Sequence, residues 1–413
     1  MGKINILVIP SDNVGGVGFY RSIQPHIQLE KQFPEKFSVT IEMNPNFNNL
    51  ESFDKYNIIH IHKGLFKDAG AFDSAMSYFK NHGIYTVMDI DDSWNLGHHH
   101  PMSAMNRIYK IDELIKNNLR RFDAVTTTTE IFAEEIRKFN KNVFVLPNSI
   151  DPTDERFITH RKPSDKLRVG MIMGSTHEYD MQLLNNITNG LSDEALNKIQ
   201  FVLCGYDLRG TIKEIDKSTG EAVERNITPK ESVWYRYEKM LTNDYSTVSP
   251  EYRKFLELFI PNAQYPNVEN EPYKRCWTKD INHYYEHYNE CDVLLAPLEP
   301  VEFNRVKSQL KVIECAFSHT AIIASDFGPY TIDLKNAIQK GGLIDSEGNA
   351  ILIDENRNHK DWKKALEKLV KNPELVKQLQ DNLYNDIHEK YDLKNVTAYR
   401  AELYESFAKS VEN

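Results

Sequence analysis

Three residues in the second half of the chain, Lys307, Lys311 and Glu314, have types and a spacing that suit the binding of a phosphorylated ligand. A helix is predicted from about 304–306 to about 317, and on it these three side chains would share one face. Two lysines in the first turns add to the positive end of the helix dipole, where anions bind well. A carboxylate one turn further along can accept hydrogen bonds from hydroxyl groups. The face would suit the pyrophosphate and ribose of a nucleotide, and the alternative interpretation is a solvated Lys/Glu face.

Two adjacent carboxylates, Asp91 and Asp92, form a second candidate group. They follow a predicted buried strand at 85–88, and the carboxyl ends of strands are where α/β sheets place their ligands. Asp91 and Asp92 are therefore the candidate catalytic residues. Loop solvation and helix capping are the alternative roles.

Two loops after predicted strands supply further residues that could face a ligand. Gly15, Gly16 and Gly18 follow the first strand and allow a tight turn and close approach of a ligand to the backbone. Their spacing is not the dinucleotide-binding fingerprint, so a dehydrogenase is not indicated. The second loop follows a strand predicted at 167–173 and contains Gly174, Ser175 and His177.

The elements that must hold these residues repeat one strand-and-helix plan twice. Predicted strands lie at 4–9, 37–42, 58–61, 85–88, 124–127 and 143–146, and then at 167–173, 199–203, 293–296, 321–324 and 350–353. Helical patterns between them favour an α/β fold with parallel sheets. The stretch 152–166, rich in proline and charge, indicates a hinge between two domains. The polar segment 207–268 has no clear core period and is predicted to be an insertion with a hairpin and a helix at 231–241.

Length and composition limit the number of domains and the classes of function that the chain could have. The 413 residues allow two or three domains, and a net charge of −10 disfavours a dedicated polyanion binder without excluding a local basic patch. Four widely spaced cysteines with no CxxC pair predict neither a disulfide framework nor a metal site. His98, His99 and His100 are adjacent and cannot all face one ion, so no metal site is predicted there. No apolar run approaches the roughly 18–20 residues that span a bilayer, and no signal-peptide pattern opens the sequence, so we expect a cytoplasmic protein without a transmembrane segment.

The stretch 302–330 resembles the donor-binding core of the GT-B glycosyltransferases, especially those of family 4. In that family a helix carrying a glutamate is followed by a turn of small residues and by a strand that ends in Ala-Ser-Asp and Gly. The matching residues here are Glu314, Ser318, His319, Thr320, Ala324, Ser325, Asp326 and Gly328. The run 147–151, Pro-Asn-Ser-Ile-Asp, also resembles the loop that ends the N-terminal domain of these enzymes, with Ser149 in place of the usual glycine.

The resemblance implies a GT-B fold, in which two Rossmann-like domains face each other across a cleft. Residues 1–155 would form the acceptor-side domain, residues 166–385 the donor domain, and a final helix within 386–413 would cross back onto the first domain. It also implies sugar transfer from a nucleotide-sugar donor, with UDP- and GDP-linked sugars favoured. The resemblance further implies retention of anomeric configuration, no required metal and no cofactor. The acceptor stays open: a glycan or lipid-linked glycan would fit, and DNA is a minor alternative.

Both domains would contribute to the donor site. The donor-binding residues that the resemblance implies, together with the motifs above, are Gly15, Gly16, Gly18, Gly174, Ser175, His177, Asn304, Lys307, Ser308, Lys311 and Glu314. Within this set, Glu314 would hold the ribose hydroxyls.

Two departures from the family pattern leave other functions open. Val306 stands where the family has the first of two glutamates that face the donor. The loop at 174–180 lacks the Arg and Lys with which relatives commonly bind phosphate, a role that Lys307 and Lys311 could take. The alternatives are a nucleotide-sugar epimerase or hydrolase on the same fold, and a non-catalytic nucleotide-sugar-binding protein.

Overall fold

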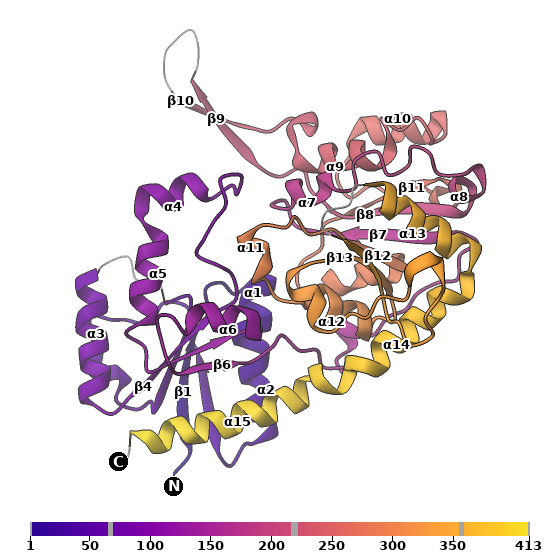
Figure 1. Cartoon of the computed structure of the whole chain (residues 1–413). Helices are drawn as coiled ribbons and strands as arrows, with labels where there is room; N and C mark the ends of the chain where they lie inside the picture. Colours follow the sequence, from indigo (N-terminus) through magenta and orange to yellow (C-terminus); the bar gives the residue numbers. More distant parts are fainter. Residues whose placement is uncertain (1, 65–68, 216–221, 355–358, 412–413) are drawn as a thin grey trace.

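The computed structural model describes residues 2–64, 69–215, 222–354 and 359–411, and contains two six-stranded parallel sheets (Figure 1). The first sheet has the order β2-β1-β3-β4-β5-β6 and the second the order β11-β8-β7-β12-β13-β14. The first is built from β1 (Ile4–Ile9), β2 (Phe37–Ile41), β3 (Ile58–His62), β4 (Tyr85–Ile90), β5 (Ala124–Thr127) and β6 (Val143–Val145). The second is built from β7 (Leu167–Ile172), β8 (Ile199–Tyr206), β11 (Tyr273–Trp277), β12 (Val293–Ala296), β13 (Ala321–Asp326) and β14 (Ile351–Asp354). The predicted α/β class with two parallel sheets is confirmed.

Continuous apolar runs explain why these segments become strands. β12 is buried along its whole length, as expected for a parallel strand that is covered on both faces. β4 continues two residues past the strand predicted at 85–88. Asp89 therefore lies inside a buried strand, 1% exposed, instead of in the loop that carries Asp91 and Asp92.

Helices surround both sheets, and the last one connects the two halves (Figure 1). The longer helices of the first half are α2 (Gln24–Gln32), α3 (Ala69–Asn81), α4 (Ser103–Tyr109), α5 (Ile111–Leu119) and α6 (Glu130–Ile136). The second half contains α7 (Glu178–Gln182), α8 (Asp193–Lys198), α13 (His359–Lys371) and α14 (Pro373–Tyr391), besides the helices described in the next two paragraphs. The final helix, α15 (Leu393–Ser410), returns to the first sheet, where Tyr404 and Phe407 join its apolar core and Phe407 stacks on Tyr85 at 4.7 Å.

The segment 207–268 forms a protruding hairpin and two helices at one edge of the second sheet (Figure 1). The hairpin pairs β9 (Thr211–Ile215) with β10 (Ala222–Asn226), and the helices are α9 (Val233–Thr242) and α10 (Pro250–Leu258). Trp234, Tyr237 and Tyr252 pack into the apolar core of the second half, so the segment is anchored although its sequence shows no clear core period.

The helix predicted from 304–306 to 317 is wrong in one respect, because it is broken in two. α11 (Glu302–Arg305) ends at Arg305, and α12 (Leu310–Phe317) begins only at Leu310. Val306 is 2% exposed and packs into the apolar core of the first half, while Arg305 forms an ion pair with Glu135 at 2.9 Å. Contacts with the opposite domain therefore override the helical pattern. Lys307 lies in the break, so it does not share a helix face with Lys311 and Glu314.

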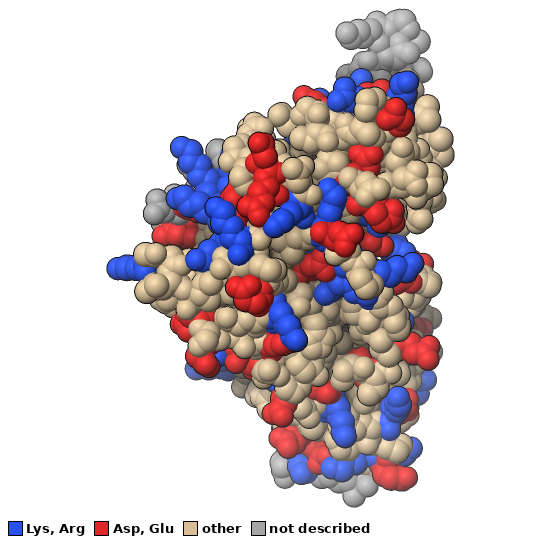
Figure 2. Space-filling view, turned by 90° about the vertical axis from the view of Figure 1, so that its right-hand side faces the viewer, with Lys and Arg blue, Asp and Glu red and all other residues tan. Residues whose placement is uncertain are grey.

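Charge is distributed unevenly over the surface. Figure 2 shows blue side chains gathered beside red ones on the face that includes α13 and α14. Five lysines of α13 border one groove there: Lys360, Lys363, Lys364, Lys368 and Lys371. A local basic patch thus exists within a chain of net charge −10. Within the residues that the structure describes, every helix is too short or too polar to span a membrane.

Candidate active site

A cavity of about 410 Å³ lies between the two halves, where the carboxyl ends of both sheets meet. Of the residues predicted from the sequence, seven line it: Gly16, Asp91, Asp92, His177, Lys307, Ser308 and Lys311. Sequence reasoning gave no site role to several others that line it, namely Tyr20, Arg21, His100, Asn148 and Tyr330. Asn148 belongs to the family-like loop at 147–151, and Tyr20 and Arg21 follow the glycine turn, so these positions offered a usable signal.

The glycine turn is shaped by the carboxylate of Asp12, which accepts hydrogen bonds from the backbone N–H groups of Val14 (3.2 Å), Gly15 and Gly18 (3.1 Å). A Cβ atom on Gly18 would lie 2.0 Å from the carbonyl oxygen of Asp12, so no side chain fits there. Of the three predicted glycines, Gly16 lines the cavity, while Gly15 and Gly18 hold the turn that presents it.

The side of the cavity that comes from the first half of the chain is called the first wall. A buried ion pair between Arg21 and Asp89 lies at its base. Arg21 donates from Nε and Nη2 to the two oxygens of Asp89, at 3.0 and 2.7 Å, and from Nη1 to the carbonyl of Leu146 at 2.7 Å. Strand register sets Thr126 beside Asp89, and its hydroxyl donates to the same carboxylate at 2.6 Å. Burial opposes ionisation of Asp89, but the charge of Arg21 holds its pKa below the ordinary value. This pair was not predicted, because Asp89 was placed in a loop.

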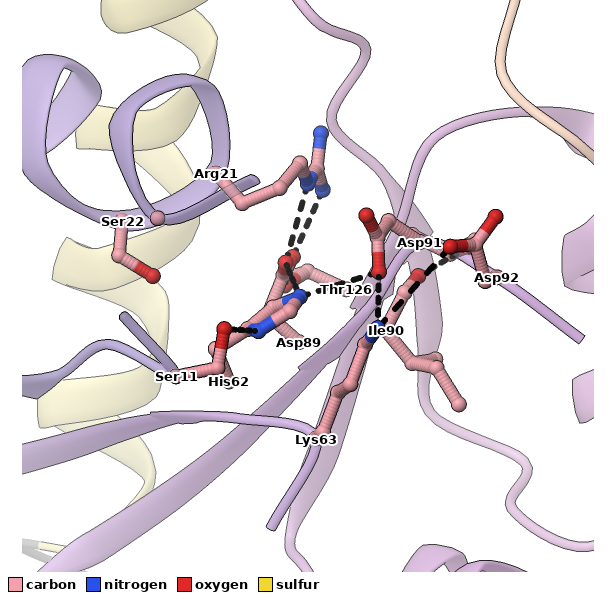
Figure 3. Close-up of polar contacts among 12 residues, drawn as sticks. Ser11, Arg21, Ser22, His62, Lys63, Asp89, Ile90, Asp91, Asp92 and Thr126 are labelled. Carbon is pink, nitrogen blue, oxygen red and sulfur yellow. Dashed lines mark hydrogen bonds and ion pairs between the residues drawn. The ribbon is translucent and has the colours of Figure 1, made fainter. Parts of the chain in front are cut away.

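Asp91 is held by two cationic or ionisable neighbours (Figure 3). His62 Nε2 lies 3.1 Å from Asp91 Oδ1, while its Nδ1 lies 2.8 Å from the hydroxyl of Ser11. Lys63 Nζ lies 3.4 Å from the same Asp91 oxygen and 4.0 Å from Asp92. His62 ends β3 and could have been found by the rule that placed Asp91, since both stand at carboxyl ends of neighbouring strands.

The two adjacent carboxylates are electrostatically unequal. Burial opposes ionisation of Asp91, but Lys63 and His62 hold its pKa far below the ordinary value. Partial burial, followed by the charge of Asp91, raises the pKa of Asp92. The side chain of Asp92 is 40% exposed against 12% for Asp91, so it is also the more accessible of the two. Carboxyl groups whose pKa values are pushed apart can take different roles in proton transfer.

The second wall, which is the side of the cavity that comes from the second half of the chain, is cationic. Lys311 Nζ donates to the hydroxyl of Tyr284 and lies 3.3 Å from Glu314 Oε2. Burial disfavours the charged form of Lys311, but the charge of Glu314 outweighs this effect and raises the pKa of Lys311, which therefore stays protonated. The ammonium of Lys307 lies over the ring of Phe303, 5.0 Å from its centroid. Both lysines face the cavity, where they can meet an anion.

His177 adds a neutral polar group to this wall. Its Nδ1 lies 2.6 Å from Asp180 Oδ2, and burial followed by the charge of Lys307 lowers its pKa. Asp180 also accepts hydrogen bonds from the backbone of Glu299 (2.7 Å) and the amide of Asn304 (2.9 Å). The predicted donor residue Asn304 therefore helps to position His177 and lines a smaller neighbouring pocket instead of the cavity itself.

Glu314 lies behind the wall. It is 0% exposed, and its carboxylate accepts hydrogen bonds from the hydroxyls of Tyr20 (3.2 Å) and Tyr288 (2.7 Å) in addition to the contact with Lys311. Tyr20 comes from the first half of the chain, so Glu314 connects both domains. Gly174 and Ser175 also lie outside the cavity lining, where their carbonyls accept from the hydroxyl of Tyr237 at 3.3 Å.

The histidine run reaches across the mouth of the cleft. His99 stacks on Tyr179 with ring centroids 4.3 Å apart, and His100 packs on Phe303 at 4.8 Å. These residues thus join the two domains. Across the described ranges, no three His, Cys, Asp or Glu side chains are grouped so that they could hold a metal ion.

Comparisons with known proteins identify the fold of the chain. No protein-family model matches the chain, and no curated protein does. Among solved structures, the chain is similar to sucrose-phosphate synthase from Thermosynechococcus elongatus, with a TM-score of 0.62 and 12% identity over 99% of this chain and 100% of that one. It is also similar to Anabaena HepE in complex with UDP and glucose (TM-score 0.60, 11% identity, 98% and 100% covered). A third is the catalytic domain of starch synthase IV from Arabidopsis thaliana bound to ADP and acarbose (0.56, 11%, 99% and 99%). At such identities the likeness concerns the fold, and the chain has the GT-B fold of two Rossmann-like domains around a cleft.

Proposed function

We propose that this protein is a glycosyltransferase that binds a nucleotide-sugar donor in the cleft and transfers the sugar to an acceptor hydroxyl. The observation that carries the proposal is the division of charge in one cavity, with Lys307 and Lys311 on one wall and Asp91 and Asp92 on the other. Because all four side chains line the same cavity, a bound donor and acceptor could meet between them.

The cationic wall is suited to the diphosphate of the donor. Lys307 and Lys311 would bind its oxygens and stabilise the charge that develops on the diphosphate as it leaves, without a required metal ion. The similar HepE structures hold UDP with glucose, or UDP-glucose, which supports a UDP-linked donor, with a GDP-linked sugar as the other favoured choice.

The acidic wall is suited to the acceptor. Asp91 is ionised and held in place, whereas Asp92 has a raised pKa and the greater exposure. Asp92 is therefore the better group to accept the proton of an incoming hydroxyl, and Lys63 lies 4.0 Å from its carboxylate. Retention of anomeric configuration is part of the proposal and rests on the resemblance to family 4.

Glu314 has a place in the same proposal. The hydroxyl of Tyr20 now occupies one oxygen of its carboxylate. A ribose hydroxyl has the same hydrogen-bonding capacity and could replace it when the donor binds. Until then, Glu314 lies behind the cavity and fixes Lys311 and Tyr288.

Thermal unfolding with a panel of UDP-, GDP-, ADP-, CMP- and TDP-linked sugars tests donor binding. A donor at 100 times its Kd should stabilise the protein by roughly 2.7 kcal/mol. Lys311→Ala should lose most of that shift, while Lys364→Ala, a change of an exposed lysine on α13, should keep it. Stabilisation by none of the sugars, or an equal shift in Lys311→Ala, would contradict the proposal.

Transfer is tested with the donor so identified and a set of glycans, lipid-linked glycans and duplex DNA as acceptors. A new glycosidic product that depends on the acceptor is the expected result. Release or isomerisation of the sugar without an acceptor would instead identify a hydrolase or epimerase.

A further inference from the structure

A second cavity, also of about 410 Å³, lies away from the cleft and shares none of its lining residues. One side comes from the 207–268 segment, through α10 and the loop 262–266 that follows it. The other side comes from the edge strand β11 and from the short 3-10 helix η6 (Tyr284–Glu290). We call it the insertion pocket. Its volume falls in the range of roughly 300–1,000 Å³ that is usual for small-molecule sites.

His287 is the feature of the insertion pocket that most needs an explanation. The residue is 1% exposed and lines the pocket, and neither ring nitrogen has a hydrogen-bond partner among the residues that the structure describes. Burial, followed by the charges of Lys279 and Lys311, lowers its pKa to about 3, so the ring is neutral near pH 7. A neutral imidazole offers one donor and one acceptor on different edges of the ring, and a hydroxyl group can pair with either of them. Buried polar groups without a partner are rare and destabilising, so a ligand that supplies one is favoured.

The cationic groups of the insertion pocket are already paired. Lys274 lies 2.6 Å from Glu290, and Lys279 lies 2.6 Å from Glu286. Arg275 is bound to the buried carboxylate of Glu238 at 2.5 and 3.0 Å. An anionic ligand would have to compete with these internal partners. The pocket therefore suits a neutral polar ligand better than a phosphate.

Aromatic rings supply the rest of the lining. Tyr265 packs against Tyr252 at 4.9 Å and Phe255 at 5.4 Å. Trp277 is half-buried, and its indole N–H donates to the carbonyl of Ala263 at 3.0 Å, which holds the loop over β11. Flat apolar rings beside neutral hydrogen-bonding groups match a ligand that has both C–H faces and hydroxyls, which is the surface of a sugar ring.

We propose that the insertion pocket is a binding site for a neutral saccharide, separate from the donor site in the cleft. His287 would bind a sugar hydroxyl, and Tyr265 and Trp277 would contact the ring faces. Because the 207–268 segment builds one side of the site, the site gives that segment a function which the donor chemistry does not require.

Ligand-observed NMR on the full chain tests this proposal with glucose, N-acetylglucosamine, maltose and cellobiose, and with inorganic phosphate and glucose 6-phosphate as charged comparisons. At least one neutral saccharide should bind the wild type. Tyr265→Ala and His287→Phe should each weaken that binding at least about tenfold. His287→Gln, which keeps a donor and an acceptor, should weaken it less than His287→Phe does.

Two controls separate this site from others. Lys307→Ala, in the cleft, should leave saccharide affinity within about twofold, and so should Tyr399→Ala, which alters an exposed tyrosine on α15. Absence of binding by every neutral saccharide at millimolar concentration overturns the proposal. So does binding that survives both Tyr265→Ala and His287→Phe, or binding that is lost in Lys307→Ala. Because donor binding is measured separately, failure here leaves the proposed transfer activity untouched.

Discussion

The two walls of the cleft differ in how their charged side chains are paired. On the first wall the charges satisfy one another: Arg21 pairs with Asp89, and Lys63 with Asp91. On the second wall Lys311 pairs with Glu314, whereas Lys307 has no ion pair with any residue in the described ranges and faces the cavity. A wall whose charges are already paired can hold a proton-transfer group in a fixed geometry. A wall with an unpaired cation can bind an anion that arrives and leaves.

Removing the Arg21–Asp89 ion pair of the first wall should have the largest effect on stability. Arg21→Met removes one partner of a pair in which both side chains are 1% exposed, so Asp89 is left as a buried carboxylate without its guanidinium partner. We expect the free energy of unfolding to fall by about 3–5 kcal/mol, measured by urea denaturation. Lys364→Ala, which breaks an exposed pair with Asp361, should cost no more than about 1 kcal/mol.

The pH dependence of the same variant gives an independent check. Asp89 has a lowered pKa in the folded protein, so its pairing stabilises the fold above the unfolded pKa of about 3.9 and is lost as pH falls below it. The stability gap between wild type and Arg21→Met should thus be full near pH 7 and narrow below about pH 4. A gap that stays constant over this range would mean that Arg21 acts through packing alone.

Asp92→Asn should lower turnover by about 100-fold or more, because the amide cannot accept the acceptor proton. Donor affinity, measured by titration, should remain near the wild-type value, since Asp92 stands on the wall opposite the lysines. Asp91→Asn should also reduce turnover, because it loosens His62 and Lys63. Normal rates in both variants would reduce the pair to loop solvation.

The second wall is tested by Glu314→Ala, which should weaken donor binding by tens of fold if the carboxylate accepts ribose hydroxyls. Lys307→Ala should weaken it less and should reduce its salt dependence, because a lysine acts as a point charge on phosphate. Tyr20→Phe is the informative comparison. If a ribose hydroxyl replaces that of Tyr20 on Glu314, removing the competing hydroxyl should leave donor affinity equal or higher, and a loss of affinity would assign Glu314 a purely structural role.

Much of this arrangement could be predicted from the sequence, because parallel strands are short apolar runs and their carboxyl ends mark the site. The position of Asp91 and Asp92 at the cavity follows from that rule, whereas Lys307 and Lys311 were predicted from a helical spacing that holds only for Lys311 and Glu314. What could not be predicted depends on contacts between distant segments. The break at Val306 arises because that side chain packs into the opposite domain, and Glu314 is covered because Tyr20 arrives from the first half. No local pattern records either contact.

The smallest effect we expect is communication between the two cavities, and it rests on the saccharide site proposed above. η6 touches both: His287 and Glu290 line the insertion pocket, while Tyr284 and Tyr288 contact Lys311 and Glu314. A saccharide that orders η6 would also fix the tyrosine that holds Lys311, so donor binding would require less ordering. We expect saturation of the pocket to tighten donor binding by about fivefold, and the donor to tighten saccharide binding by the same factor. Titrating each ligand with and without the other measures both factors. Tyr284→Phe should reduce the coupling while saccharide affinity alone stays unchanged, and a donor affinity that does not respond to a filled pocket would show that the two sites act independently.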